Sequence, residues 1–139
     1  MPQNLGSSSN SKLILIGEDD IDDQELLMEI FTAVDDSFSV VFTSNSTELI
    51  GFLEQHEGHH PCLILLDYNM PGLNGVEILK ELKKRPTYQK IPKIIWSTSK
   101  STTYRDICLE IGATDYLVKP SNVNELMDTV RYMLNICAS

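Results

Sequence analysis

Charged and hydroxyl side chains stand directly after short apolar runs at several points in the chain. Glu18 and Asp19 follow the run KLILIG, and Asp67 ends the run CLILLD. Ser97 ends KIIWS, and Lys119 ends the run YLVK. Carboxylates held close together repel one another, so they bind either protons or a hard cation. If the fold gathers these groups, they form a set of acids with one ammonium and one hydroxyl beside them.

Such a set is suited to phosphoryl transfer. Carboxylate oxygens suit Mg²⁺, which keeps several waters and takes few protein ligands. A bound cation would let an anionic phosphoryl donor approach, and one carboxylate could then act as the nucleophile and become an acyl phosphate. The lysine and the hydroxyl would contact the phosphoryl oxygens as charge develops. The competing interpretation is a surface cluster of acids paired with a lysine, without chemistry.

The elements that must position these residues are five short strands that alternate with helices. The predicted strands are residues 12–17, 38–43, 62–67, 93–97 and 115–118. The third is apolar on both faces, as a buried parallel strand should be. The alternation predicts an α/β fold, a (βα)5 doubly wound parallel five-stranded sheet with helices on both faces. Ligands bind at the carboxyl ends of the strands in such sheets, which is where the polar residues stand.

Helical periodicity and capping residues mark the intervening segments. Leu27, Ile30, Phe31 and Val34 recur at the spacing of an amphipathic helix. Asparagine followed three residues later by glutamate predicts a helix start. This pattern occurs at Asn45 and Glu48, Asn74 and Glu77, and Asn122 and Glu125, and Gly112 is the expected C-terminal cap of the fourth helix.

Length, charge and cysteine content limit the classes of protein to which the chain can belong. The 139 residues fit one domain, which we expect at 12–138 after a polar tail at 1–11. The net charge of −9 argues against direct nucleic-acid binding or an anionic membrane surface. No apolar stretch approaches the roughly 20 residues that a membrane span needs. Three widely spaced cysteines, with no CxxC, predict neither a disulfide framework nor a zinc site, and favour a reducing cytoplasm.

Four motifs in order resemble the response-regulator receiver family, over about residues 12 to 137. They are the acidic run GEDD, the segment LILLDYNMPGLNG, Ser97 at the end of the fourth strand, and the run YLVKP. The second is similar to the family pattern D-x-x-M-P-x-x-x-G. The resemblance implies a flavodoxin-like strand order 2-1-3-4-5 and a magnesium-dependent signalling module, which is not an enzyme in the ordinary sense.

The resemblance also implies roles for individual metal-site residues. Asp67 matches the phosphoacceptor. Asp19 matches a direct magnesium ligand, and Glu18 matches an acid that acts through water. Asn69 matches the position whose backbone carbonyl coordinates the metal.

The remaining roles concern switching. Ser97 matches the hydroxyl that moves toward the phosphoryl group, and Lys119 matches the lysine that pairs with it. Tyr116 matches an aromatic residue that turns inward on activation. Pro120 matches a proline whose preceding peptide bond is often cis in the family, and an X–Pro bond lowers the cost of that form.

Two features depart from the family pattern. Trp96 precedes the switch serine where smaller aliphatic residues are common, so we expect unusual packing there. The acidic run continues through Asp20, Asp22 and Asp23. We interpret these as acids at the start of a helix, where the helix dipole favours them, although the extra charge could also strengthen metal binding.

Other functions fit the sequence less well. A flavodoxin-like cofactor binder needs a phosphate loop after the first strand, where this chain has EDDIDD. No GxxxxGK[ST] is present for a P-loop hydrolase. An aspartyl-phosphate phosphatase carries its nucleophile after the first strand, not the third. A degenerate receiver that serves only as a protein-binding module stays open as the alternative.

The signal is expected to leave through protein contacts, because no output domain is predicted after the last helix. The resemblance implies a sensor histidine kinase or a histidine phosphotransfer protein as the phosphoryl donor. The surface of the fourth helix, the strand 115–118 and the last helix would meet a downstream protein target or a second copy of the chain. The sequence identifies neither the kinase nor the target.

Overall fold

A parallel sheet of five strands is the centre of the fold in the computed structural model, which describes residues 12–138. The elements follow one another as β1 (Leu13–Gly17), α1 (Ile21–Val34), β2 (Ser39–Thr43), α2 (Ser46–Gln55), β3 (Leu63–Asp67), α3 (Gly75–Lys83), α4 (Pro86–Gln89), β4 (Lys93–Ser97), α5 (Thr102–Ile111), β5 (Asp115–Val118) and α6 (Val123–Ala138). The predicted tail at residues 1–11 lies outside the described residues.

The strand order is β2-β1-β3-β4-β5, with every pair parallel, so the predicted order is confirmed. All five residues of β3 are buried, because this strand lies at the centre of the sheet with helices over both faces. Its central position brings the end of β3 between the ends of β1 and β4. Asp67 therefore lies at the middle of the carboxyl edge.

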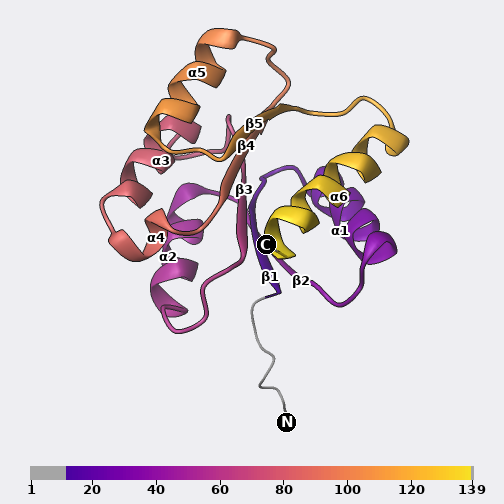
Figure 1. Cartoon of the computed structure of the whole chain (residues 1–139), viewed down its shortest axis with the longest axis horizontal. Helices are drawn as coiled ribbons and strands as arrows, with labels where there is room; N and C mark the ends of the chain where they lie inside the picture. The colour runs from indigo at the N-terminus through magenta and orange to yellow at the C-terminus, as the bar shows by residue number, and fades with distance from the viewer. Residues whose placement is uncertain (1–11, 139) are drawn as a thin grey trace.

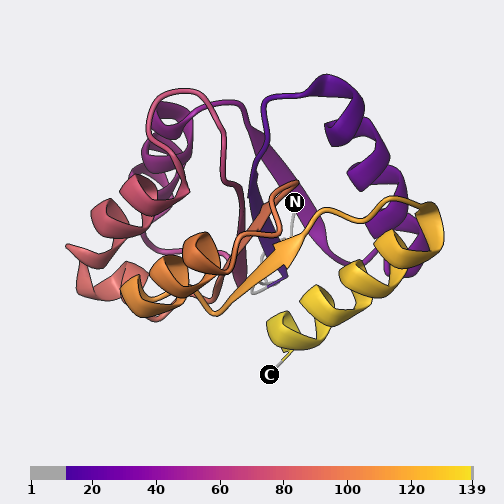
Figure 2. The same ribbon diagram turned by 90° about the horizontal axis from the view of Figure 1, so that it is seen from above.

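Helices cover the two faces of the sheet in separate layers (Figure 1 and Figure 2). α1 and α6 pack side by side on one face, around a core that includes Phe31 and Val130. α2, α3, α4 and α5 cover the other face, where Leu49, Leu79 and Cys108 belong to the second core. Alternate residues of each strand point into one core or the other, which is the geometry that a period of two dictates.

The capping predictions hold at three helix starts. The Asn74 side chain accepts from the backbone N–H of Glu77, and Glu77 accepts in return, which completes a capping box at α3. Asn45 caps α2 in the same way, but the Glu48 carboxylate turns to Ser44 instead of Asn45. Asn122 accepts from Glu125 at the start of α6. Gly112 ends α5 with a φ of 126°, a conformation that glycine adopts at low cost.

One cysteine prediction is wrong. Cys62, just before β3, and Cys137, in the last turn of α6, form a disulfide across 75 positions, with their Cα atoms 5.0 Å apart. The spacing of the cysteines along the chain does not indicate the pair, because only the packing of α6 on the sheet brings the two residues together. Cys108 is a free and buried thiol.

Two other details also differ from expectation. The peptide bond before Pro120 is trans, as are all peptide bonds in the part of the chain that the structure describes. The trans form is the more stable one even before proline, by about 0.5–1 kcal/mol. The short helix α4 was not predicted, and Pro86, which lies beyond the end of α3, opens it at the first-turn position that proline tolerates. None of the described helices combines the length and the apolarity that a bilayer crossing requires.

Candidate functional site

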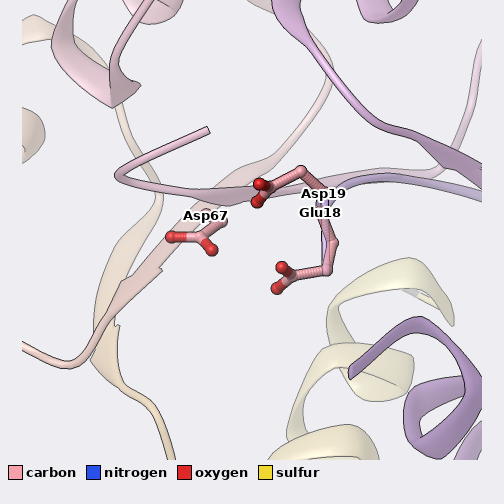
Figure 3. A group of neighbouring side chains, drawn as sticks. All are labelled: Glu18, Asp19 and Asp67. Carbon is pink, nitrogen blue, oxygen red and sulfur yellow. The ribbon is translucent and has the colours of Figure 1, made fainter. Parts of the chain in front are cut away.

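Three carboxylates meet at the carboxyl edge of the sheet, and they come from two neighbouring strands. Asp67 is the last residue of β3, and Glu18 and Asp19 follow directly after β1. One oxygen from each lies within 4.8 Å of the others. Figure 3 shows the three side chains facing a common space. Glu18 and Asp67 are buried, whereas Asp19 is exposed, so the cluster is open to solvent on one side.

Lys119 neutralises part of this charge. Its Nζ lies 2.9 Å from Oδ2 of Asp67 and 3.3 Å from Oε1 of Glu18. A third carboxylate, that of Asp23 in the first turn of α1, is 3.8 Å away. Burial lowers the pKa of Lys119, but the hydrogen bond to Asp67 and the charges of Asp67 and Glu18 outweigh this effect, so the net shift is upward. The side chain is therefore a stable cation beside Asp67.

Glu18 is the most perturbed acid of the site. Burial raises its pKa to about 7, and the nearby charge of Asp67 also raises it. The backbone N–H of Asp20 and the Lys119 ammonium act in the opposite direction. A buried carboxyl group close to a second one resists ionisation, which is the expected consequence of crowding negative charge. A cation bound at this edge would relieve that repulsion.

The loop after Asp67 is fixed by contacts within it and with α2. The backbone N–H of Asn69 donates to Oδ1 of Asp67 at 3.1 Å. Further along, the Ser46 hydroxyl accepts from the backbone N–H of Leu73. Gly72 has a φ of 92°, and a Cβ there would meet the Ser46 hydroxyl oxygen, so this position requires glycine. The start of α2 thus holds the loop that carries Asn69.

The two switch candidates lie on the side of the sheet toward α5. The Ser97 hydroxyl is buried and accepts from the backbone N–H of Ser99 at 3.0 Å. The Tyr116 ring is also buried, and its hydroxyl donates to the backbone carbonyl of Ser99 at 3.0 Å. The two side chains are thus linked through Ser99. The inward position predicted for Tyr116 after activation is already present in this structure.

The oxygen-rich donor set fits a divalent cation. Glu18, Asp19 and Asp67 supply hard oxygen ligands of the kind that Mg²⁺, Ca²⁺ and Mn²⁺ take. Lys119 contacts the cluster at Asp67 and Glu18, so the side of the cluster with the exposed Asp19 stays accessible to solvent.

Two residues beside the site were not assigned a role from the sequence. Asp23, together with Asp20 and Asp22, was interpreted as an acid at the start of a helix whose charge could also strengthen metal binding, and no contact with Lys119 was expected. Asp20 does cap α1, with Asp22 and Asp23 in the first turn, but Asp23 also faces Lys119. Trp96 was noted only as unusual packing, yet Lys119 Nζ lies 5.4 Å from the centroid of its ring. Neither contact leaves a signal in the spacing of residues.

A family model, Response regulator receiver domain, matches residues 14–131. The chain is similar to the response regulator Rcp1 of Synechocystis sp., with 29% identity over 128 residues that cover 89% of this chain and 87% of Rcp1. It is also similar to the two-component response regulator ARR6 of Arabidopsis thaliana, with 41% identity over 71 residues, 49% of this chain and 38% of ARR6. The chain spans less than half the length of this and two related plant regulators.

Two crystal structures extend the comparison to three dimensions. The phosphorylated cyanobacterial phytochrome response regulator RcpA superposes with a TM-score of 0.83 at 28% identity, covering 94% of this chain and 96% of RcpA. The Mn²⁺-bound form of Rcp1 superposes with a TM-score of 0.77 at 29% identity, covering 88% of this chain and 91% of Rcp1.

Proposed function

Since the chain belongs to the response regulator receiver domain family, we propose that Asp67 is the residue that accepts the phosphoryl group. The contact between Lys119 and Asp67, at 2.9 Å, carries this proposal. Of the three carboxylates that Lys119 approaches, Asp67 is the nearest to this partly buried cation, and a phosphoryl group on Asp67 would meet the same cation. The solved structure of phosphorylated RcpA supports the chemistry by analogy.

The reaction needs little from the protein beyond position and charge. A carboxylate oxygen of Asp67 attacks phosphorus, the bond between phosphorus and the donor breaks, and the donor leaves with the electron pair. With acetyl phosphate the products are the Asp67 acyl phosphate and acetate. Lys119 then pairs with the phosphoryl oxygens, whose added charge is about −1.5 to −2.

We propose Mg²⁺ as the cation that the acids hold. Asp19 and Asp67 would be direct ligands with the Asn69 carbonyl, and Glu18 would act through water. The cation, when bound, offsets the negative charge of the donor and of the carboxylates. The Mn²⁺ bound to Rcp1 supports a divalent cation, and the small number of carboxylates fits Mg²⁺, which keeps several of its waters and takes few protein ligands.

The proposed partner in two-component signalling is a sensor histidine kinase or a histidine phosphotransfer protein. Ser97 and Tyr116 would pass the change to the surface of α5, β5 and α6, where a downstream protein or a second copy would bind. Tyr104, Ile107 and Val118 supply exposed apolar side chains on this surface. Contact with nucleic acid or membrane is not part of the proposal. We propose a cytoplasmic location from the family alone, because the disulfide between Cys62 and Cys137 removes the cysteine argument for it. No observation favours a degenerate receiver.

The test is phosphorylation by acetyl phosphate with Mg²⁺, followed by mass spectrometry of intact protein and of peptides. The parent should gain one acid-stable, base-labile phosphoryl group on the peptide that contains Asp67. Asp67→Asn should remove the label, because an amide is a poor nucleophile. Asp106→Asn, which changes an exposed acid on α5, should label like the parent. Equal labelling of Asp67→Asn would overturn the assignment of Asp67.

A further inference from the structure

Trp96 lies under the side chain that pairs with Asp67. It is the one tryptophan of the chain, and its side chain is almost fully buried, at 4% exposure. Its ring belongs to the core between the sheet, α1 and α6. Lys119 Nζ is placed over the ring, 5.4 Å from the centroid. That distance lies within the range in which the negative face of an indole attracts an ammonium group.

The backbone keeps the ring and the carboxylate in a fixed relation. Trp96 in β4 is the register partner of Asp67 in β3 and of Leu117 in β5. Its carbonyl accepts from the backbone N–H of Tyr68 at 2.9 Å. Lys119 continues the same ladder, since its N–H donates to the carbonyl of Ser97 at 2.8 Å. Three adjacent strands therefore align the ring, the lysine and the carboxylate.

Lys119 has competing positions available. Asp67 and Glu18 attract its ammonium from one side, and Asp23 attracts it from α1 at 3.8 Å. A cavity of about 70 Å³ opens beside it, lined in part by Asp23, Trp96 and Pro120. The long side chain of lysine has the space to move toward Asp23 and away from Asp67. The ring of Trp96 also lines this cavity, and its face contacts the ammonium in the position that it takes beside Asp67.

The indole N–H does not take part in this arrangement. Trp96 Nε1 is buried and has no hydrogen-bond partner among residues 12–138. What the ring supplies to the site is therefore its face and its volume. A phenylalanine ring has a weaker face, and an aliphatic side chain has none.

We propose that Trp96 is a positioning residue for Lys119: its indole face holds the ammonium against Asp67, ready for the phosphoryl oxygens. The proposal rests on the proposed function of Asp67 and extends it to a residue that touches neither phosphate nor metal. Loss of the ring face should slow phosphorylation by about 3- to 20-fold, the range that a partly desolvated cation–π contact predicts.

The test is a double-mutant cycle on the initial rate of phosphorylation by acetyl phosphate at saturating Mg²⁺. Trp96→Leu should slow the reaction, and Trp96→Phe should recover part of the rate. In the Lys119→Met background, Trp96→Leu should change the rate by less than about two-fold, because the group that it positions is gone. Phe31→Leu removes a ring from the same core and should lower stability without slowing the reaction.

The negative charge of the indole face can also be reduced in part, because the chain has a single tryptophan that can be replaced by an analogue. Biosynthetic replacement with 5-fluorotryptophan alters this ring alone, almost without a change of shape. Fluorine withdraws charge from the ring face, so the rate should fall below that of the parent but stay above that of Trp96→Leu. Equal slowing by Trp96→Leu in the parent and in Lys119→Met would overturn the proposal, because it would assign Trp96 to packing alone.

A second measurement separates this proposal from the proposed function. The Hε protons of Lys119 should resonate upfield in the parent, because the Nζ atom next to them lies over the indole ring, 5.4 Å from its centroid. The shift should shrink in Trp96→Phe and vanish in Trp96→Leu. If the parent takes no phosphoryl group, the function of Asp67 fails, whereas ordinary Hε shifts in the parent would overturn the positioning role whatever the labelling shows.

Discussion

Lys119 and Asp67 stand 52 positions apart in the sequence, and their side chains meet at 2.9 Å between Nζ and Oδ2. The contact joins the ends of β3 and β5, two strands that are separated by β4. It places Lys119, a partly buried cation, beside the carboxylate that both a metal and a phosphoryl group would engage. Removal of the Lys119 charge should therefore change the affinity for the metal and the rate of phosphorylation in opposite directions.

Lys119→Met should strengthen the binding of Mg²⁺ and weaken the acceptance of phosphate. Removal of a positive charge next to the carboxylates should raise the metal affinity by roughly 3- to 10-fold, as expected for partly screened charges a few ångströms apart. The rate of phosphorylation should fall, because the phosphoryl oxygens lose their cationic partner. Metal titration and mass spectrometry measure the two effects. Lys100→Met, at an exposed position, is the control and should change neither. A parallel fall in both would contradict this prediction.

The affinity for Mg²⁺ should increase with pH near neutrality. Because burial holds the pKa of Glu18 at about 7, its carboxyl group is mostly protonated at pH 6 and mostly ionised at pH 8. Metal binding favours the ionised form, so the apparent affinity should rise by roughly ten-fold between these pH values. Trp96 fluorescence provides the titration. Glu18→Gln should bind more weakly with little dependence on pH, and an equally steep profile in that variant would assign the titration to another group.

The apolar strands predicted both the parallel sheet and the place where its acidic residues gather. β3 is apolar throughout because it is buried on both faces, and parallel strands bring their carboxyl ends to one edge. Asp67, Glu18 and Lys119 could therefore be expected to meet before any distance was known. The strand order required the family resemblance in addition, since periodicity does not determine which strands are neighbours.

The features that the sequence missed depend on packing between distant elements. The disulfide between Cys62 and Cys137 requires the end of α6 to lie beside the start of β3, and no local pattern encodes that distance. The contact between Trp96 and Lys119 depends on side-chain rotamers. An inward Tyr116 was predicted only after activation, and the rotamer that it takes in this structure is likewise set by packing. Helix α4 is a single turn, too short for a periodic pattern to mark it.

Reduction of the disulfide should lower the free energy of unfolding. The bond closes a long loop, and the chain-entropy model predicts a stabilisation of about 4 kcal/mol. Measured stabilisations by disulfides are often smaller than this model predicts. We expect a loss of about 2–4 kcal/mol in urea denaturation when a reductant is added. The variant with Cys62→Ser and Cys137→Ser should match the reduced parent and ignore the reductant. A parent whose midpoint does not respond to reductant would show that the bond adds nothing.

The stability should also rise with pH above about 8 because of Lys93. This lysine is only 4% exposed, and its ammonium donates to the carbonyls of Tyr88 and Ile91 at 2.6 and 2.8 Å. Burial lowers its pKa from 10.5 to about 8. Between these two values the unfolded chain binds more protons than the folded one, so the free energy of unfolding increases with pH. Below pH 8 both states are protonated, and this contribution is constant.

Urea denaturation of the parent and of Lys93→Met, from about pH 7 to pH 9.5, tests this expectation. The difference between the two profiles isolates Lys93 from the tyrosines and thiols that titrate in the same range. The difference in the free energy of unfolding between the parent and Lys93→Met should be constant up to about pH 8. Above that pH the parent should gain stability relative to the variant, by an amount on the order of 2 kcal/mol at pH 9.5. The measurement stops short of pH 10.5, so the full shift is not reached. Two profiles that stay parallel across this range would mean that Lys93 keeps an ordinary pKa, with its ammonium charged in the folded protein.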